Sequence, residues 1–451
     1  MRRLAVGLLL VVLVSAGAAV PADSVRAVAP AYTATDLGTL GGGRSRATAV
    51  NARGKVVGSS AAADGVAHAF LWQDGRMTDL GTLGLDFAEA TGINERGQVV
   101  GTSYQQDYGR ARPFLWENGK LTDLGTLGAG YGIASAINDR GQVVGANMTA
   151  DFSVHAFRSE NGAMRDLGTL GGASSWAEAI DGRGRVVGSA DTADGHAHAF
   201  LWENGVMTDL GTLGGTESQA WGINERGQVV GTGLTADGSW HAFLWESGSM
   251  TDLGTLDGTE SGAYGINGRG QVVGRSGRPV DKSDLYRAFV WRAGVLTDLG
   301  DGVGYGVNER GDVVGVSGPD SNGRAVMWSL PAPSLTDRRP GTGRPLRASR
   351  SGTSATVSTL AGVDLEATVS LVVRERRSGK RLTLLKGSRL AGTTLAVRAG
   401  TARAEIDTPQ TFAVRALLPT RRLERGAVYQ LVLTATGING KTTTLTIGFL
   451  G

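Results

Sequence analysis

The chain has 451 residues, among them 71 glycines, 11 prolines, five histidines and no cysteine, and its formal net charge is +3. The absence of cysteine excludes disulfides, thiolate metal sites and a cysteine nucleophile. Glycine makes up about 16% of the chain, roughly twice its usual share, but it follows no triplet repeat and 41% of the residues are hydrophobic, which excludes both a collagen-like helix and a disordered polymer.

The N-terminus has the pattern of a secretory signal peptide. Arg2 and Arg3 precede an apolar run over residues 4–14, and small residues follow that run. The run is too short to span a bilayer, so we interpret residues 1–22 as a signal peptide, with cleavage between positions 18 and 29. No later stretch approaches the length of a membrane span. These features predict a secreted, extracellular protein without membrane insertion.

A repeat of about 43 residues fills most of the chain. The tripeptide Asp-Leu-Gly recurs at spacings of 43 to 46 residues. Its aspartates are Asp36, Asp79, Asp123, Asp166, Asp209, Asp252 and Asp298. A period of this length is typical of solenoids, propellers and other repeat architectures.

Each copy contains four short segments rich in Val, Ile, Phe, Trp and Thr. In the second copy these are residues 90–94, 98–101, 112–116 and 120–124. Asn-x-x-Gly and Asn-Gly turns separate the first segment from the second and the third from the fourth, and both favour tight hairpins because Asn and Gly accept positive φ. Four antiparallel strands in a repeat of this length match one blade of a β-propeller. A β-solenoid is the alternative, although its coils are usually shorter and need no hairpin at every step.

The strand count predicts a ring that the start of the chain closes. Three of the four strand types occur seven times between residues 32 and 330, and the fourth does so only if residues 32–37 are included. The last copy has no outer strand of its own. We therefore predict an all-β, seven-bladed propeller over residues 32–330 whose last blade is completed by the N-terminal strand, which removes an open edge.

A donor side chain and an aspartate recur at fixed positions and predict a structural pair in each blade. The third strand begins with His or Arg, and in six copies an Asp follows 11 residues later as a diagonal neighbour on the same sheet face. Because His and Arg share donor capacity but not the ability to ligate metals, their interchange favours a hydrogen-bonded pair. The seventh Arg has no such Asp, and ring closure predicts Asp36 as its partner. The predicted pairs are His68–Asp79, Arg112–Asp123, His155–Asp166, His198–Asp209, His241–Asp252, Arg287–Asp298 and Arg324–Asp36.

The repeated phrases resemble a known family. Asp-Leu-Gly-Thr-Leu-Gly-Gly, Ile-Asn-x-x-Gly-x-Val-Val-Gly and His-Ala-Phe-Leu-Trp recur over residues 32–328, and this combination is similar to the HAF-repeat family of extracellular bacterial proteins. Copies three, six and seven depart from the last phrase at Arg158, Arg287 and Arg324. The resemblance implies an exported repeat protein and assigns no catalytic residue or ligand.

A different module follows the repeats. Residues 331–350 are rich in Pro, Gly, Ser and Arg and predict a basic linker. About seven strand-like runs within residues 351–451 favour an immunoglobulin-like β-sandwich, with a weak resemblance to bacterial Ig-like or fibronectin-like modules. From residue 331 onward 19 Lys and Arg face 7 Asp and Glu, a net charge of +12, against −9 for residues 1–330. Such a basic module is suited to bind an anionic wall polymer or to dock on its own acidic propeller. The alternative is that its arginines only form a solvated surface.

Variation between the copies predicts a binding face. The Asn-x-x-Gly and Asn-Gly hairpins hardly change, whereas the loops between the second and third strands and between copies vary and share the other rim. Because loops on a rigid scaffold carry function, we predict ligand binding at this variable rim. Near its axial end lie five aromatic residues that we expect to stack on a sugar or clamp a peptide: Tyr131, Trp176, Trp221, Tyr264 and Tyr305. The alternative is that these rings fill gaps between blades.

The sequence predicts a non-enzymatic extracellular module that binds a glycan or a protein. We predict no catalytic residue, metal site or cofactor, because Glu89, Glu178, Glu217 and Glu260 are scattered and form no acid–base pair at a defined spacing. A secreted glycan hydrolase or lyase is the alternative; it requires two carboxylates, or a carboxylate with Tyr and Arg, to converge over the axis. A third hypothesis is a cell-wall-associated structural protein held by its basic module. Export and the scarcity of aromatics among the basic residues disfavour nucleic acid as a partner.

Overall fold

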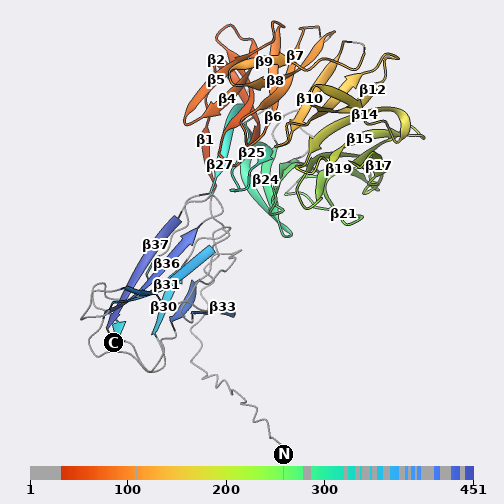
Figure 1. Cartoon of the computed structure of the whole chain (residues 1–451). Coiled ribbons are helices and arrows are strands. Elements are labelled where there is room, and N and C mark those ends of the chain that lie inside the picture. The colour runs from red at the N-terminus through yellow and green to blue at the C-terminus, as the bar shows by residue number, and fades with distance from the viewer. Residues whose placement is uncertain are drawn as a thin grey trace, which may run out of the picture.

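The structure is a computed structural model, shown in Figure 1. It describes residues 32–330 except 108, 129, 257, 278–285 and 319–322, and the backbone of ten strands between residues 336 and 450. The predicted signal peptide and most of the predicted linker lie outside the described residues. Every regular element of the described part is a β-strand, so the all-β prediction is confirmed there.

Residues 32–330 form six antiparallel sheets. Five of them have four strands each, paired in chain order, and each corresponds to one copy of the repeat. Their strands are β2–β5 (Gly41–Val50, Val56–Ala62, Ala67–Gln73, Arg76–Gly81), β6–β9 (Phe87–Ile93, Val99–Tyr104, Ala111–Glu117, Lys120–Asp123), β10–β13 (Gly132–Ile137, Val143–Met148, Val154–Glu160, Ala163–Asp166), β14–β17 (Gly171–Ile180, Val186–Thr192, Ala197–Glu203, Val206–Asp209) and β18–β21 (Gly214–Ile223, Val229–Thr235, Trp240–Glu246, Ser249–Asp252).

The sixth sheet has seven strands because one long strand belongs to two copies. Residues 295–301 of β25 pair with β24 as the outer strand of copy six, and residues 302–307 pair with β26 as the inner strand of copy seven. The N-terminal strand β1 pairs with β27 at the far edge, with Asp36 opposite Val326. The strands are β22–β27 (Glu260–Ile266, Val272–Gly277, Arg287–Arg292, Val295–Val307, Val313–Ser317, Arg324–Ser329) and β1 (Thr33–Asp36).

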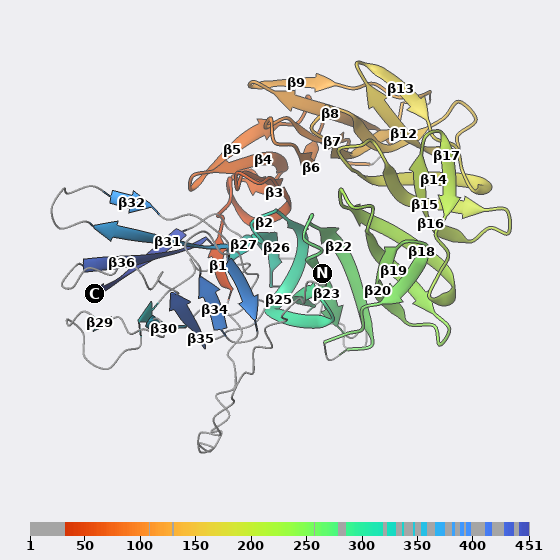
Figure 2. The same cartoon turned by 60° about the horizontal axis from the view of Figure 1, so that its bottom comes forward.

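The sheets follow one another around a ring (Figure 2). A ladder of asparagine side chains links the turns that follow their inner strands. In six copies the Asn of the Asn-x-x-Gly turn donates through Nδ2 to the backbone carbonyl of the equivalent residue in the next copy, over 2.9 to 3.1 Å. The bonds run from Asn51 to Asn94, Asn94 to Asn138, Asn138 to Asp181, Asn224 to Asn267, Asn267 to Asn308 and Asn308 back to Asn51. The ladder therefore returns to its starting copy.

In copy four an ion pair takes the place of this hydrogen bond between copies. The turn of copy four begins with Asp181, which has no amide to donate, and Arg185 occupies the position that is Gln in four other copies. Arg185 Nε lies 2.6 Å from Asp181 Oδ2, and Arg185 Nη2 donates to the Asn224 carbonyl at 3.4 Å. The arginine thus both neutralises the buried carboxylate and makes the contact to the next copy.

Each inner strand contains a β-bulge at the same position. Its register shifts at the third residue before the turn Asn or Asp, which leaves that residue without a partner in the ladder. A bulge bends the strand and re-aims the unpaired side chain. The bulge also brings an inner-strand carbonyl over the glycine of the Val-Val-Gly strand: a Cβ on Gly188 would lie 1.8 Å from the Trp176 oxygen. This close approach explains why that strand requires glycine.

The core lies between successive sheets. The Phe of the third strand is fully buried in copies one to six, and Val326 takes its place in copy seven. These rings pack among the paired valines and small alanines of the same sheet and the preceding one, as in the cluster that joins Phe114 to Val57, Ala69 and Val99. Alternation of apolar residues along short strands therefore buries both faces of each sheet between its neighbours.

The C-terminal strands form two further sheets. One has the order β28-β30-β35-β34-β33 and the other β29-β37-β36-β31-β32. Eight of these strands lie within residues 351–451, where the sequence predicts about seven, and β28 and β29 lie inside the predicted linker. The bounds are β28–β32 (Thr336–Asp337, Leu346–Arg347, Thr353–Ser358, Glu366–Arg374, Arg381–Thr383) and β33–β37 (Ser388–Ala391, Thr394–Val397, Thr411–Ala416, Val428–Thr436, Thr442–Leu450).

Candidate axial site

The seven bulged residues line one cavity in the middle of the ring. This axial cavity has a volume of about 490 Å³. Copies one to three contribute small hydroxyl side chains to it, copy four a glutamate, and copies five to seven aromatic rings. The bulged residues are Thr48, Thr91, Ser135, Glu178, Trp221, Tyr264 and Tyr305. The cavity is therefore polar on one side and aromatic on the other.

The aromatic side is a continuous row of three rings. The Trp221 and Tyr264 centroids are 5.9 Å apart in an edge-to-face arrangement, and those of Tyr264 and Tyr305 are 5.5 Å apart and tilted. Trp221 Nε1 is buried and has no hydrogen-bond partner among the residues that the structure describes. A buried donor without a partner is costly, so this indole is poised to donate to a bound group.

Three of the five aromatic residues singled out in the sequence meet here, and two do not. Tyr131 and Trp176 are partly buried but do not belong to the wall of the axial cavity. The cavity wall also consists of strand residues throughout, whereas the sequence pointed to the loops of the variable rim. The physical reason is the bulge, which turns a strand side chain toward the axis where simple alternation would not.

Two glutamates that looked unconnected in the sequence line the same cavity. Glu178 is the bulged residue of copy four, and Glu89 lies on the inner strand of copy two. Burial raises the pKa of Glu178 to about 7, although a hydrogen bond with Ser135 lowers it in part. Burial also raises the pKa of Glu89, and the positive charge of Arg46 opposes that rise. The position of each glutamate relative to the turn Asn or Asp of its own copy is the sequence feature that indicates this placement. Glu217 and Glu260 do not line the axial cavity.

Two arginines complete the cavity and rest on its tyrosines. The Arg46 guanidinium lies 4.1 Å from the centroid of Tyr305. That of Arg275 lies 4.0 Å from the Tyr286 centroid and 5.8 Å from the Tyr264 centroid. Neither forms an ion pair with a carboxylate in the part of the chain that the structure describes. The site thus combines two cations, two carboxyl groups of raised pKa and a row of aromatic faces.

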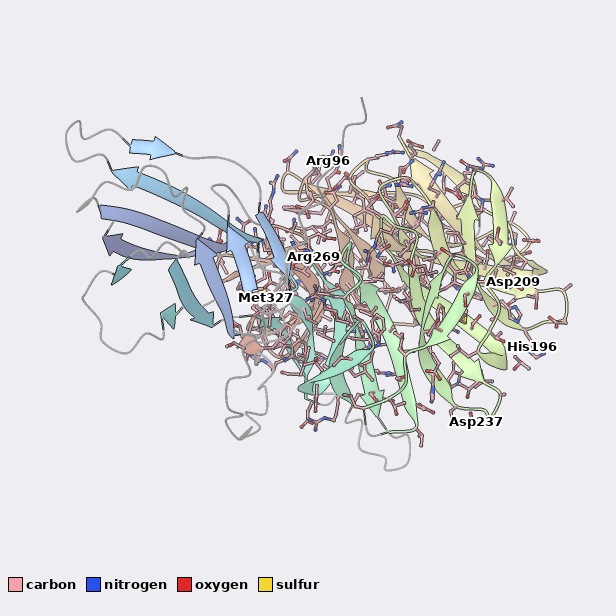
Figure 3. The ribbon with its side chains drawn as sticks, turned by 90° about the horizontal axis from the view of Figure 1, so that it is seen from below. Arg96, His196, Asp209, Asp237, Arg269 and Met327 are labelled. Atoms are coloured by element: carbon pink, nitrogen blue, oxygen red, sulfur yellow. The ribbon has the colours of Figure 1, made fainter. Side chains whose placement is uncertain are left out.

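The structure also brings together each of the seven predicted donor–aspartate pairs. The His Nδ1 atoms lie 2.7 or 2.8 Å from their aspartates, and Arg112 Nη1 lies 2.9 Å from Asp123 Oδ2. Arg287 Nε bonds Asp298 at 2.8 Å, and Arg324 Nη2 lies 3.4 Å from Asp36. Figure 3 shows Asp209 at the outer edge of the molecule, so these pairs belong to the periphery and not to the axial site.

Within the described segments, no three His, Asp or Glu side chains are grouped so that they would hold a metal ion. Among the same residues, no helix is long and apolar enough to cross a membrane.

No family model and no curated protein matches the chain. Several solved structures are similar to it. TolB from Acinetobacter baumannii aligns with 58% of this chain at 11% identity and a TM-score of 0.37, and this chain covers 60% of the TolB chain. A mutant of AofleA from Arthrobotrys oligospora aligns with 60% of this chain and 89% of its own at 13% identity and a TM-score of 0.38. A mutant of Aleuria aurantia lectin in complex with Fucα1-6GlcNAc aligns with 58% of this chain and 98% of its own at 13% identity and a TM-score of 0.34. Likeness at this level carries no functional conclusion.

Proposed function

We propose that this chain is an exported HAF-repeat protein that binds a saccharide in the axial cavity of a seven-bladed propeller. In this proposal the seven copies are seven blades, and β1 completes the last one. The asparagine ladder and the pairing of β1 with β27 support that count, because both link copy seven to copy one. The N-terminal signal pattern supports export. We infer that the module acts by binding.

One observation carries the binding proposal: seven equivalent bulges turn seven side chains toward one cavity, and three consecutive ones are aromatic. Stacked or tilted rings present apolar faces that match the C–H faces of a pyranose, while nearby polar groups fix its hydroxyls. The unpartnered Trp221 Nε1 is one such group, and the hydroxyls of the opposite wall are others. If the rings only filled gaps between blades, they would have no reason to face a cavity.

A direct binding measurement tests this proposal. The mature protein is screened on a glycan array, and the best saccharides are titrated calorimetrically. Trp221→Ala should weaken binding at least tenfold, since about 1.4 kcal/mol corresponds to a factor of ten and stacking on an indole contributes that order. Trp176→Ala is the matched control and should change affinity less than twofold. Equal binding by wild type and Trp221→Ala, with both folded by circular dichroism, would refute the axial site.

An enzymatic function is the second candidate, and one specific observation favours it. A hydrolase or lyase requires carboxylates to converge with Tyr and Arg over the axis, and Glu89, Glu178, Tyr264, Tyr305 and Arg46 do line one cavity. A carboxyl group with a pKa near neutrality suits general acid–base catalysis. Incubation of each bound saccharide with wild type and Glu178→Gln, followed by assays for reducing ends and unsaturated uronates, separates the two functions. Turnover that Glu178→Gln abolishes would make the protein an enzyme.

The C-terminal module extends the proposal to the cell surface. We propose that its two sheets pack as an Ig-like sandwich and that its charge of +12 holds the protein on an anionic wall polymer. The attraction between exposed charges is screened by salt. A wash of intact cells with 1 M salt, roughly a 3 Å screening length, should therefore release the protein. Retention after the wash would exclude an electrostatic attachment.

A further inference from the structure

The axial cavity shares a wall with a second compartment. This inter-blade compartment lies between copies five and six and has a volume of about 220 Å³. Trp221, Tyr264 and Arg275 line both spaces. The inter-blade compartment adds two further aromatic residues, Trp240 and Tyr286. A group bound at the shared wall is therefore within reach of aromatic faces on both sides.

Arg275 is the residue that distinguishes this wall from the equivalent position in every other copy. It follows the Val-Val-Gly segment of the second strand, where the other copies carry a residue no larger than valine. Those residues are Ser59, Thr102, Ala146, Ser189, Thr232 and Val316. The repeat scaffold thus needs no long side chain here, and packing of the blade does not explain an arginine.

Among the residues that the structure describes, no carboxylate forms an ion pair with Arg275. Two other half-buried arginines of the ring have carboxylate partners: Arg185 has Asp181 at 2.6 Å and Arg112 has Asp123 at 2.9 Å. Arg275 instead lies over the faces of Tyr264 and Tyr286 and forms no ion pair within the described residues. Stacking on aromatic rings fixes the plane of a guanidinium and leaves its N–H edge available for a bidentate acceptor.

Three carboxyl groups share the two compartments with Arg46 and Arg275: Glu89 and Glu178 line the axial cavity, and Glu260 lines the inter-blade compartment, where it forms no ion pair with a described residue. Arg46 and Arg275 each carry a full positive charge, whereas burial raises the pKa values of both Glu89 and Glu178 and so favours their neutral forms. A neutral carboxyl group donates a hydrogen bond and does not repel an anion. The cavity is therefore suited to a ligand that brings one negative charge with it.

We propose that the ligand is an acidic oligosaccharide whose uronate carboxylate binds the guanidinium of Arg275 while its sugar rings stack on Trp221 and Tyr264. This inference rests on the proposed saccharide-binding function and specifies its substrate class. The carboxylate accepts two parallel N–H bonds from Arg275 at the wall common to both compartments. One sugar unit occupies the axial cavity and its neighbour the inter-blade compartment, where Trp240 and Tyr286 supply further faces.

Calorimetric titration with matched acidic and neutral ligands tests this assignment. The probes are short oligomers of galacturonate, mannuronate and glucuronate, each also prepared as the methyl ester, and a sulfated oligosaccharide that contains no uronate. Wild type should bind at least one uronate oligomer about tenfold more tightly than its ester at low salt. Arg275→Gln should lose that preference but keep its affinity for the ester. Arg76→Gln, on an exposed hairpin outside both compartments, is the matched control and should behave as wild type.

The outcomes separate this inference from the proposed function. If esters and acids bind equally well and Trp221→Ala weakens both, saccharide binding stands and the assignment of an acidic ligand fails. If Arg275→Gln retains the preference for the acid, the role of Arg275 fails. Binding of the sulfated oligosaccharide without binding of any uronate would overturn the carboxylate assignment. If neutral and acidic saccharides all fail to bind, both the inference and the proposed function fall.

Discussion

Asn308 Nδ2 donates a hydrogen bond to the backbone oxygen of Asn51 over 3.1 Å, although 257 residues separate them in the chain. The bond is buried and is equivalent to the five that join other neighbouring copies. It closes the ring at its inner circumference. The outer circumference closes separately, where Arg324 meets Asp36 and β1 pairs with β27.

The two closures should differ in their contributions to stability. Asn308→Ala removes one of the two donors to the buried Asn51 carbonyl, which keeps only the Gly54 N–H, and it also removes the acceptor for the Arg310 and Asp312 N–H groups. We therefore expect a loss of about 2–3 kcal/mol. Asp36→Ala breaks an exposed ion pair and should cost about 1 kcal/mol or less. Urea unfolding of both variants measures the difference. Equal losses would show that the inner ladder does not hold the ring together.

The ion pair in copy four predicts a single and a double variant with opposite results. Arg185→Gln leaves the buried Asp181 carboxylate unpaired and should destabilise the protein by about 3–5 kcal/mol. The double variant Asp181→Asn with Arg185→Gln restores the Asn and Gln that copies two, three, five and six carry at these positions. It should recover wild-type stability to within about 1 kcal/mol. If the double variant does not regain the wild-type free energy of unfolding, Arg185 has a role beyond replacing one hydrogen bond of the ladder.

The periphery of the ring was predictable from the sequence, whereas its centre was predictable only at Trp221, Tyr264 and Tyr305. The partner of each His or Arg follows from strand alternation and a short hairpin, so even Asp36 could be assigned to Arg324 by counting strands. The axial cavity depends on the bulge, which shifts the register by one residue and leaves no signature in residue type: the bulged position holds Thr, Ser, Glu, Trp or Tyr. Glu89 and Glu178 line the same cavity because the ring curves, so their register relative to the turn residues becomes informative only once that curvature is known.

Exchange within the peripheral pairs should be nearly neutral. His241→Arg reproduces the arrangement of copies two, six and seven and should change stability by less than about 0.5 kcal/mol. Asp252→Ala should cost about 1 kcal/mol, because Asp252 Oδ1 also accepts the Gly254 N–H at 2.7 Å and fixes the turn. Thermal unfolding of both variants checks the order. A larger loss for His241→Arg than for Asp252→Ala would contradict a structural role shared by His and Arg.

The stability of the ring should fall as pH rises through the range set by Glu178. Burial raises the pKa of this carboxyl group from its ordinary 4.5 to about 7. Below about pH 4.5 the group is protonated in both folded and unfolded chains and costs nothing. Between the two values the unfolded chain releases the proton while the folded chain retains it, so the folded state binds more protons and loses stability with rising pH. Above about pH 7 the loss is complete.

Glu178→Gln should remove this dependence. The variant and the wild type should have similar free energies of unfolding at pH 4, and the variant should be more stable by about 2 kcal/mol at pH 8, after allowance for solvent in the cavity. Ser135 is the hydrogen-bond partner that the variant retains, and Arg46, Arg275 and Glu89 are the charged groups of the same wall and are unchanged. Urea titrations at a series of pH values measure the difference, with Glu203→Gln on an exposed hairpin as the control. A difference between wild type and Glu178→Gln that stays constant from pH 4 to pH 8 would show that the pKa of Glu178 is the same in the folded and the unfolded chain, so that this carboxyl group is ionised in the axial cavity at neutral pH.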